Sequence, residues 1–203
     1  MEGDYMKLKR IGAYFIDVFI IAIISSFISL IPIFGENAKK NEEFSNYVLN
    51  EILGTGSGEI NEEEIKDKTY EYEKDTIMSS ILSLGVTVAY FGVYGYFFKG
   101  QTLGKKVLKI QIVPNNDGEE LNPGLFMLRE IIKNNSIFEL ANLIVLSVCS
   151  KSLYFSLNGI ISTAGDIVLL LIIGTMIFRD DERGLHDVIC KTKVIDLKEE
   201  NSN

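Results

Sequence analysis

The stretch IGAYFIDVFIIAIISSFISLIPIF, residues 11–34, decides the fold, because its only charged side chain is Asp17. A helix needs about 20 apolar residues to cross the roughly 30 Å of hydrocarbon in a bilayer. The stretch is longer than the apolar part of a typical signal peptide, and no small-residue cleavage motif follows it. We therefore expect a retained membrane span over residues 11–34.

Further apolar segments follow this one along the chain. Residues 77–98 contain no charged side chain, and residues 153–178 carry only Asp166 near their middle. Residues 134–150 are short for a span, so they form either a helix joined to the next one near Ser150–Lys151 or an interfacial or re-entrant segment. We favour four membrane spans, over about residues 11–34, 77–98, 134–150 and 153–178.

The overall composition excludes several functions. The net charge of −8 argues against nucleic acid as a partner, because a phosphate backbone requires a basic face. One histidine and two cysteines are too few for a histidine–cysteine zinc site or a disulfide framework. The pair His186–Asp187 is a weak basis for acid–base catalysis, so we expect no enzyme activity, no metal and no cofactor. We expect one domain over residues 5–197 and a polar tail over 198–203.

The distribution of Lys and Arg predicts the orientation in the membrane. Basic residues precede the first span and recur after the second and the last one. Residues 35–76 instead contain five Lys and twelve Asp or Glu residues. We therefore expect a multi-pass protein of a bacterial plasma membrane with both termini in the cytoplasm. Residues 35–76 would then form an acidic, partly flexible extracytoplasmic loop.

Two short segments outside the spans alternate polar and apolar residues. They are KVLKIQIV, residues 106–113, and KTKVIDL, residues 191–197, and the turn signal Asn116-Asp117-Gly118 follows the first. Such alternation is typical of half-buried strands. The expected fold is an all-α membrane protein, a bundle of four transmembrane helices with a small cytoplasmic β-hairpin or strand element.

Three blocks outside the apolar cores resemble the RDD family of membrane proteins, named for one arginine and two aspartates. The blocks are Arg10 with Asp17 in the first span, GQTLGKKVLKIQIV at residues 100–113 with the later Arg129, and RGLHDVICKTKVI at residues 183–195. The resemblance identifies Arg10, Asp17 and Asp187 as the motif residues. It also implies a cytoplasmic interfacial motif that comprises Thr102, Gly104, Lys105, Lys106, Arg129, Arg183 and His186.

The chain departs from the family pattern at two places. Lys109 stands where a glycine is common, and Cys190-Lys191 stands where an Ala-Gly pair is common. Roles in transport, including cation/proton exchange, have been proposed for the family. The resemblance therefore implies a membrane location and suggests ion handling.

Three carboxylates lie within the apolar segments, namely Asp17, Glu139 and Asp166. Each costs about 2.5–3.5 kcal/mol at the centre of a membrane, so we expect them to face inward. Desolvated carboxylates that repel one another favour binding of a proton or a monovalent cation. On this transport hypothesis, Asp17 and Asp166 would face one shared, wet cavity.

The alternative is a non-catalytic scaffold or regulatory partner subunit. Inside a membrane Asp17 needs a polar partner, for which Arg129, Arg183 or a hydroxyl group from another helix are the candidates. The scaffold hypothesis predicts that an arginine seals Asp17, and that Gly85, Ala89 and Gly92 face a helix or a partner. Asp187 would pair with a basic residue on its own side of the membrane, for which Arg10, Lys105 and Lys106 are the candidates. Beyond the lipid bilayer, the expected partners are further copies of the chain or another membrane protein.

Overall fold

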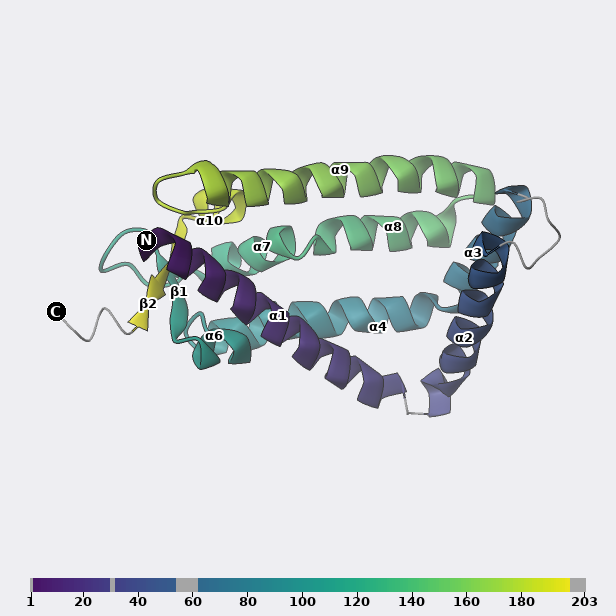
Figure 1. Cartoon of the computed structure of the whole chain (residues 1–203), viewed down its shortest axis with the longest axis horizontal. Helices are drawn as coiled ribbons and strands as arrows, with labels where there is room; N and C mark the ends of the chain where they lie inside the picture. The colour runs from purple at the N-terminus through teal and green to yellow at the C-terminus, as the bar shows by residue number, and fades with distance from the viewer. Residues whose placement is uncertain (1, 30–31, 54–61, 198–203) are drawn as a thin grey trace.

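The computed structural model describes residues 2–29, 32–53 and 62–197. These residues form a mainly helical structure with one two-stranded sheet (Figure 1). The elements in chain order are α1 (Glu2–Ser29), α2 (Pro32–Ile52), α3 (Glu62–Asp75), α4 (Ile77–Val88), the π-helical turn η1 (Ala89–Tyr94), α5 (Gly95–Phe97), α6 (Leu103–Val107), β1 (Ile110–Pro114), α7 (Pro123–Lys133), α8 (Ser136–Val148), α9 (Lys151–Phe178), α10 (Leu185–Ile189) and β2 (Thr192–Asp196).

Three helical segments in the described part of the chain are long and apolar enough to cross a membrane. They are Tyr5–Phe27, Ile77–Phe97 and Lys151–Phe178. Helices α7 and α8 add a fourth crossing only if they are counted as one broken span, because they are bent by 69° relative to each other. The expected span at residues 134–150 is therefore not a straight crossing helix; α8 alone covers only Ser136–Val148.

The first apolar helix is shifted from the expected range of residues 11–34. It already includes the basic residues around Arg10, and its candidate span ends at Phe27. A new helix, α2, begins at Pro32. Proline fits the first turn of a helix and disfavours helical geometry in the residue before it, so an apolar stretch can continue through the end of one helix.

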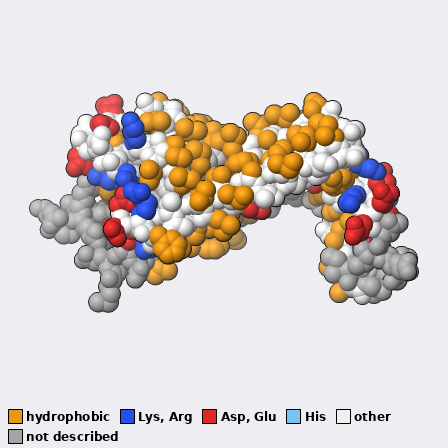
Figure 2. Space-filling view, turned by 90° about the horizontal axis from the view of Figure 1, so that it is seen from above, with side chains coloured by type: hydrophobic (Ala, Val, Ile, Leu, Met, Phe, Trp, Pro, Cys, Tyr) orange, Lys and Arg blue, Asp and Glu red, His pale blue; other side chains and the backbone are white. Residues whose placement is uncertain are grey.

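The long helices lie side by side, and smaller elements cover the two ends (Figure 1). Helices α4, α8 and α9 run along the long axis, and α1 crosses them at an angle while contacting α4 and α6. The sheet, α6 and α10 lie at the end that holds both termini, and α2 and α3 lie across the opposite end. Figure 2 shows hydrophobic side chains over the middle of the face above α9, with charged side chains toward the two ends. Such an extensive apolar surface is typical of helices that face lipid.

The described part of the acidic segment at residues 35–76, which was expected as a loop, contains helix α3 and most of helix α2. Helix α3 starts with three acidic residues, which the positive end of a helix dipole favours. Phe44 of α2 stacks on Tyr72 of α3, and Lys40 pairs with Asp75. The Gly-Ser stretch, at residues 54–61, lies outside the described residues.

The two expected strands pair with each other in antiparallel register, with Ile112 opposite Val194. The first strand begins at Ile110 rather than at Lys106, because Leu103–Val107 form the short helix α6. Lys109 makes the transition from helix to strand with a φ angle of 57°. The two-stranded sheet is tied to α1 by an ion pair between Lys9 and Asp196.

Candidate functional site

Asp17 lies at the centre of a closed hydrogen-bond network and is only 1% exposed. Its carboxylate accepts hydrogen bonds from the Tyr90 hydroxyl at 2.7 Å, the Thr102 hydroxyl at 2.5 Å and the Gly104 backbone N–H at 2.7 Å. The partner of Asp17 is therefore a set of neutral donors, including the hydroxyl groups that were one of the expected alternatives. Neither Arg129 nor Arg183 contributes an ion pair to it in the described chain.

Gly104 allows α6 to approach α1 closely enough for this network. A Cβ atom at position 104 would lie 2.2 Å from the Ala13 carbonyl oxygen and 2.8 Å from Asp17 Oδ1. The carboxylate thus caps the start of α6, where backbone N–H groups lack helical partners. The π-helical turn η1 holds Tyr90 in contact with the same network, since π-helical turns re-aim side chains within a helix.

Asp187 is the second fully enclosed aspartate, with 0% exposure. Arg129 reaches Asp187 Oδ1 with Nε at 2.8 Å and a terminal nitrogen at 2.7 Å, and Arg10 pairs with Oδ2. The Thr192 hydroxyl and the Gly184 N–H donate further hydrogen bonds. Burial by itself raises the pKa of Asp187, but the surrounding positive charges, led by Arg129, hold it well below its usual range. Asp187 therefore stays ionised and links α1, α7 and α10.

Further charged groups surround this ion pair. Glu130 pairs with Arg129 and with Lys133, and it is 2% exposed. Lys105 is buried, donates to the Thr102 hydroxyl at 3.3 Å and makes no ion pair with any described residue. Burial lowers the pKa of Lys105 to about 7. Burial likewise lowers the pKa of His186 to about 3, so its imidazole is neutral at pH 7.

A model of the RDD family matches residues 7–191 of the chain, and this match covers most of its length. The chain belongs to the RDD family. No curated protein and no solved structure matches it. Together with the long apolar helices, the match describes an RDD-family, membrane-type helical protein.

The three residues that give the RDD family its name occupy two separate networks. Arg10 pairs with Asp187, as one of the expected alternatives has it, whereas Asp17 is held by hydroxyl and N–H groups. The other motif residues divide in the same way: Thr102 and Gly104 contact Asp17, and Arg129 contacts Asp187. The remaining four take other positions: Lys105 and His186 are buried, Lys106 is exposed, and Arg183 binds Asp181 and Asn115.

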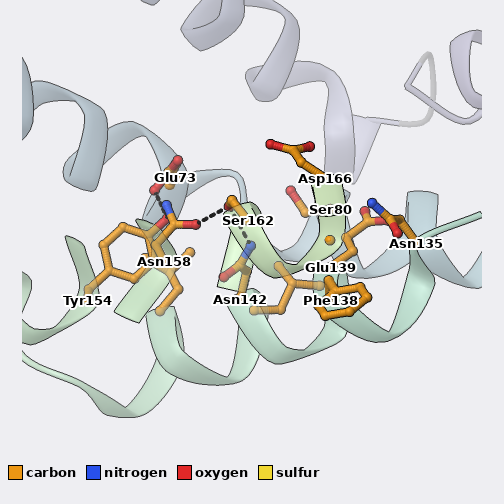
Figure 3. Close-up of a pocket in the computed structure, with 13 residues that line it drawn as sticks. Glu73, Ser80, Asn135, Phe138, Glu139, Asn142, Tyr154, Asn158, Ser162 and Asp166 are labelled. Atoms are coloured by element: carbon orange, nitrogen blue, oxygen red, sulfur yellow. Dashed lines mark hydrogen bonds between the residues drawn. The ribbon is translucent and has the colours of Figure 1, made fainter. Parts of the chain in front are cut away.

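Glu139 and Asp166 line a different cavity from Asp17, which corrects the expectation of one shared cavity. This cavity, of about 370 Å³, lies among α3, α4, α8 and α9 (Figure 3). Asp17 instead lines a second cavity of about 370 Å³ between α1 and α9, near the opposite end of the bundle. The three carboxylates of the expected ion site are therefore divided between two cavities. The first cavity is lined by Glu139 and Asp166 and also by Glu73.

A chain of hydrogen bonds runs along the wall of the first cavity (Figure 3). Asn142 donates to Ser162, Ser162 donates to Asn158, and Asn158 donates to the Tyr154 hydroxyl. The Tyr154 hydroxyl in turn donates to Glu73, which lies on α3 at the end of the bundle away from the termini. Each hydrogen bond in this series is donated in the direction of Glu73. At the other end of the series, in the interior of the bundle, acceptor atoms therefore remain without donors.

The inner end of the cavity is rich in oxygen atoms that lack donors. The side-chain oxygens of Asn135 and Asn142 are buried without a hydrogen-bond partner among the described residues. Figure 3 shows Glu139 and Asp166 near this end, and neither carboxylate takes part in a hydrogen bond or ion pair with residues 2–29, 32–53 or 62–197. Within the same residues, no group of three His, Cys, Asp or Glu side chains is arranged to hold a metal ion.

Several residues of both networks were not identified from the sequence. Tyr90 is one of several aromatic residues at the end of an apolar segment, and no motif marks it; it is 8% exposed and donates a hydrogen bond to Asp17. Glu130 is a charged residue in an amphipathic segment, and Glu73 and Tyr154 lie in segments without a motif. Among the hydroxyl groups of the long helices, those of Thr87 and Thr163 donate to carbonyl groups of their own helices, whereas Ser162 lines the cavity.

Proposed function

We propose that this RDD protein handles monovalent cations or protons through the cavity between α8 and α9. The observation that supports the proposal is the lining of this cavity, which combines two exposed carboxylates, Glu139 and Asp166, with two buried asparagine oxygens that lack a partner among the described residues. Carboxylate and amide oxygens are suitable ligands for hard cations, and a carboxylate can exchange the cation for a proton. No catalytic step forms part of the proposed function.

The break between α7 and α8 supports this proposal. Asn135 lies at the break in a left-handed conformation with a φ angle of 56°, and it lines the cavity. Discontinuous helices place helix termini and free carbonyl groups inside a membrane, which is how many transporters build ion sites. Asp166 is exposed in the structure, and its contact with lipid would cost about 2.5–3.5 kcal/mol, so the proposal places water in the cavity beside it.

The proposed topology has four crossings, with the bent pair α7–α8 counted as one and both termini in the cytoplasm of a bacterial cell. An even number of crossings agrees with the position of the start of α1 and of the β1–β2 sheet at one end of the bundle (Figure 1). The cavity would then open at the extracytoplasmic end beside Glu73 and reach Asp166 near the middle of α9. Water and ions would enter from outside the cell.

Asp17 has a structural role in this proposal rather than an ion-binding one. Three donors already occupy its carboxylate, and no described residue connects it with Asp166. Binding a cation at Asp17 would require breaking hydrogen bonds between α1, η1 and α6. This replaces the hypothesis in which Asp17 and Asp166 act on the same ion.

Purified protein in sealed vesicles with an imposed pH gradient tests the proposal. We expect Na⁺, K⁺ or Li⁺ to discharge the gradient, and we expect Asp166→Asn and Glu139→Gln each to reduce that discharge at least tenfold. Glu71→Gln serves as the matched control, because Glu71 is an exposed carboxylate of α3 that does not line the cavity. Wild-type discharge rates in the Asp166→Asn, Glu139→Gln double variant would overturn the proposal.

The second candidate is a scaffold or partner subunit, and one observation favours it. Gly85 is exposed on α4, and a Cβ atom there would have no described atom within 4 Å. Ala89 is also exposed, whereas Gly92 already packs against Met127 within the chain. A smooth surface of this kind allows another transmembrane helix to approach closely. This candidate predicts that Gly85→Leu dissociates an oligomer measured by light scattering in detergent, and that wild-type vesicles show no cation-driven discharge.

A further inference from the structure

The cavity between α1 and α9 combines a basic inner end with apolar walls. Its lining includes four basic side chains, namely Arg10, Lys105, Arg129 and Lys133, but only one carboxylate among the described residues, that of Asp17. The walls are apolar side chains of α1 and α9, namely Ile11, Phe15, Leu169, Ile172, Ile173 and Met176. The proposed ion-handling cavity does not share any of these residues.

The charges at the inner end are not balanced within the protein. Asp187 pairs with Arg10 and Arg129, and Glu130 pairs with Arg129 and Lys133, so two carboxylates serve three basic side chains. Lys105 is left without a carboxylate partner in the described chain, although it is only 6% exposed. A buried ammonium group without a counter-ion is costly, so this end of the cavity favours an incoming anion.

His186 provides an independent indication that a ligand belongs in this cavity. Its imidazole lines the cavity and is 3% exposed, and neither ring nitrogen makes a hydrogen bond with a described residue. The carboxylate oxygen Asp187 Oδ2 lies 3.5 Å from Nε2. Buried polar groups are almost always satisfied, so this unpartnered imidazole calls for a hydrogen-bonding ligand.

The cavity is open on its apolar side toward the surface that faces lipid. Phe15 is 68% exposed on α1, and Leu169 and Ile173 are 40% and 41% exposed on α9. A ligand that enters here must therefore combine an anionic group with a long apolar part. Basic pockets between transmembrane helices are known to hold the headgroups of anionic phospholipids.

We propose that the α1–α9 cavity binds an anionic phospholipid from the leaflet at the end of the bundle that carries both termini. The lipid phosphate lies beside Lys105 and His186, and one acyl chain follows the groove between Phe15 and Ile173. The bound lipid supplies the negative charge that Lys105 lacks and covers the apolar opening. It thereby joins α1 to α9 at a site where the protein itself supplies few contacts between these helices.

Fluorescence quenching provides a direct test, because the chain contains no tryptophan. Phe15→Trp places one reporter in the cavity wall, and Phe19→Trp places a matched reporter on the same helix, 67% exposed and outside the cavity lining. Each variant is reconstituted in phosphatidylcholine vesicles with a minor fraction of either phosphatidylglycerol or phosphatidylcholine that carries brominated acyl chains. We expect brominated phosphatidylglycerol to quench the reporter at position 15 more strongly, and both lipids to quench the reporter at position 19 equally.

Two further substitutions in the Phe15→Trp background locate the lipid. Lys105→Gln removes the unpaired charge and should weaken the apparent affinity for phosphatidylglycerol by about tenfold, the factor that one charge-assisted hydrogen bond contributes. Ile173→Phe narrows the groove without touching the ion pairs, so it tests the site even if Lys105→Gln fails to fold. We expect it too to reduce the preference for phosphatidylglycerol.

Four outcomes would overturn the proposal. They are equal quenching of the position 15 reporter by both lipids, an equal preference at positions 15 and 19, a preference that survives both Lys105→Gln and Ile173→Phe, and shielding of position 15 from both lipids. The second outcome would indicate general attraction of anionic lipid to the protein, and the last would indicate that another copy of the chain covers the cavity.

Discussion

Arg10 on α1 forms an ion pair with Asp187 on α10, although the two residues are 177 positions apart in the sequence. Arg129 on α7 binds the other oxygen of the same carboxylate. One buried aspartate therefore holds three helices together at the end of the bundle that carries both termini. The motif arginine and the second motif aspartate act as a structural unit.

We predict that Asp187→Asn destabilises the protein strongly. The substitution leaves Arg10 and Arg129 buried without their counter-charge, and removal of one partner of a buried pair typically costs about 3–5 kcal/mol. Thermal unfolding in detergent would measure the loss. Asp181→Asn is the matched control, because Asp181 is 40% exposed in its pairs with Arg179 and Arg183 and should change stability by less than about 1 kcal/mol. Equal effects of the two substitutions would contradict the proposed role of Asp187.

Gly104→Ala should prevent the close packing of α6 on α1. The new methyl group would lie 2.2 Å from the Ala13 carbonyl oxygen, so α6 must shift and the hydrogen bond from Gly104 to Asp17 is lost. Gly159→Ala is the control, because a Cβ atom there has no described atom within 4 Å and alanine favours the helix by about 1 kcal/mol. We expect a lower unfolding temperature for Gly104→Ala and an unchanged or higher one for Gly159→Ala. A Gly104→Ala protein as stable as the wild type would disprove the tight contact.

The two departures from the family pattern fall at positions with left-handed backbone. Lys109 has a φ angle of 57° and Lys191 has a φ angle of 52°, each directly between a short helix and a strand. The left-handed conformation costs a residue with a side chain about 1–2 kcal/mol, and glycine avoids that cost. Part of the gain is lost because glycine is more flexible in the unfolded chain.

We therefore expect Lys109→Gly and Lys191→Gly each to stabilise the protein by up to about 1 kcal/mol. The two effects should be nearly additive, which chemical denaturation of the single and double variants would show. Lys193→Gly is a suitable control, because it lies in β2, where glycine weakens the strand. Destabilisation by both substitutions at positions 109 and 191 would contradict the interpretation.

Stability should rise with pH because of Lys105. Its pKa is lowered to about 7 in the folded protein, from 10.5 in the unfolded chain. Between these values the unfolded state binds more protons than the folded state, so the free energy of unfolding increases with pH from about 7 to 10. Among the charged groups that face Lys105, Lys133 and Arg129 also lower its pKa, whereas Glu130 and Asp17 raise it.

Lys105→Met should flatten this pH dependence, since methionine has a similar length and no charge to bury. We expect the variant to be more stable than the wild type at pH 7 and close to it at pH 10, as measured by thermal unfolding in detergent. The difference between the two proteins isolates Lys105 from other lysines that titrate at high pH. Parallel stability curves for the two proteins would show that Lys105 keeps its ordinary pKa.

Much of the fold follows from local features of the sequence. Apolar blocks of bilayer length predict the long helices, and period-two alternation predicts the strands that pair as β1 and β2. The expected loop at residues 35–76 was less well predicted, because α2 and α3 carry many charges and depend on contacts such as the Phe44–Tyr72 stack. The start of α2 at Pro32 and the start of β1 at Ile110 depend on backbone conformation more than on hydrophobicity.

The candidate sites were predicted only in part, because their residues come from distant segments. The pairing of Arg10 with Asp187 was one of three options, and charge alone could not distinguish it from the lysines at 105 and 106. Charged residues within apolar segments were expected to face a common cavity. Glu139 and Asp166 do line the same cavity, whereas Asp17 lines a different one. The sequence around an aspartate in an apolar segment does not show whether the aspartate binds an ion or caps a helix. For Asp17 the structure shows the second role, because Tyr90 and Thr102 donate hydrogen bonds to its carboxylate.

The most direct test of the proposed ion-handling function is whether water reaches the cavity between α8 and α9 from one side of the membrane. In a protein with Cys149 and Cys190 replaced by serine, Ser162→Cys places a thiol in the cavity, and Ile160→Cys places one on the exposed apolar face of the same helix. A membrane-impermeant thiol reagent should label position 162 only from the side opposite the termini and should leave position 160 unlabelled. Absence of labelling at position 162, labelling from the side of the termini, or equal labelling at both positions would contradict the account.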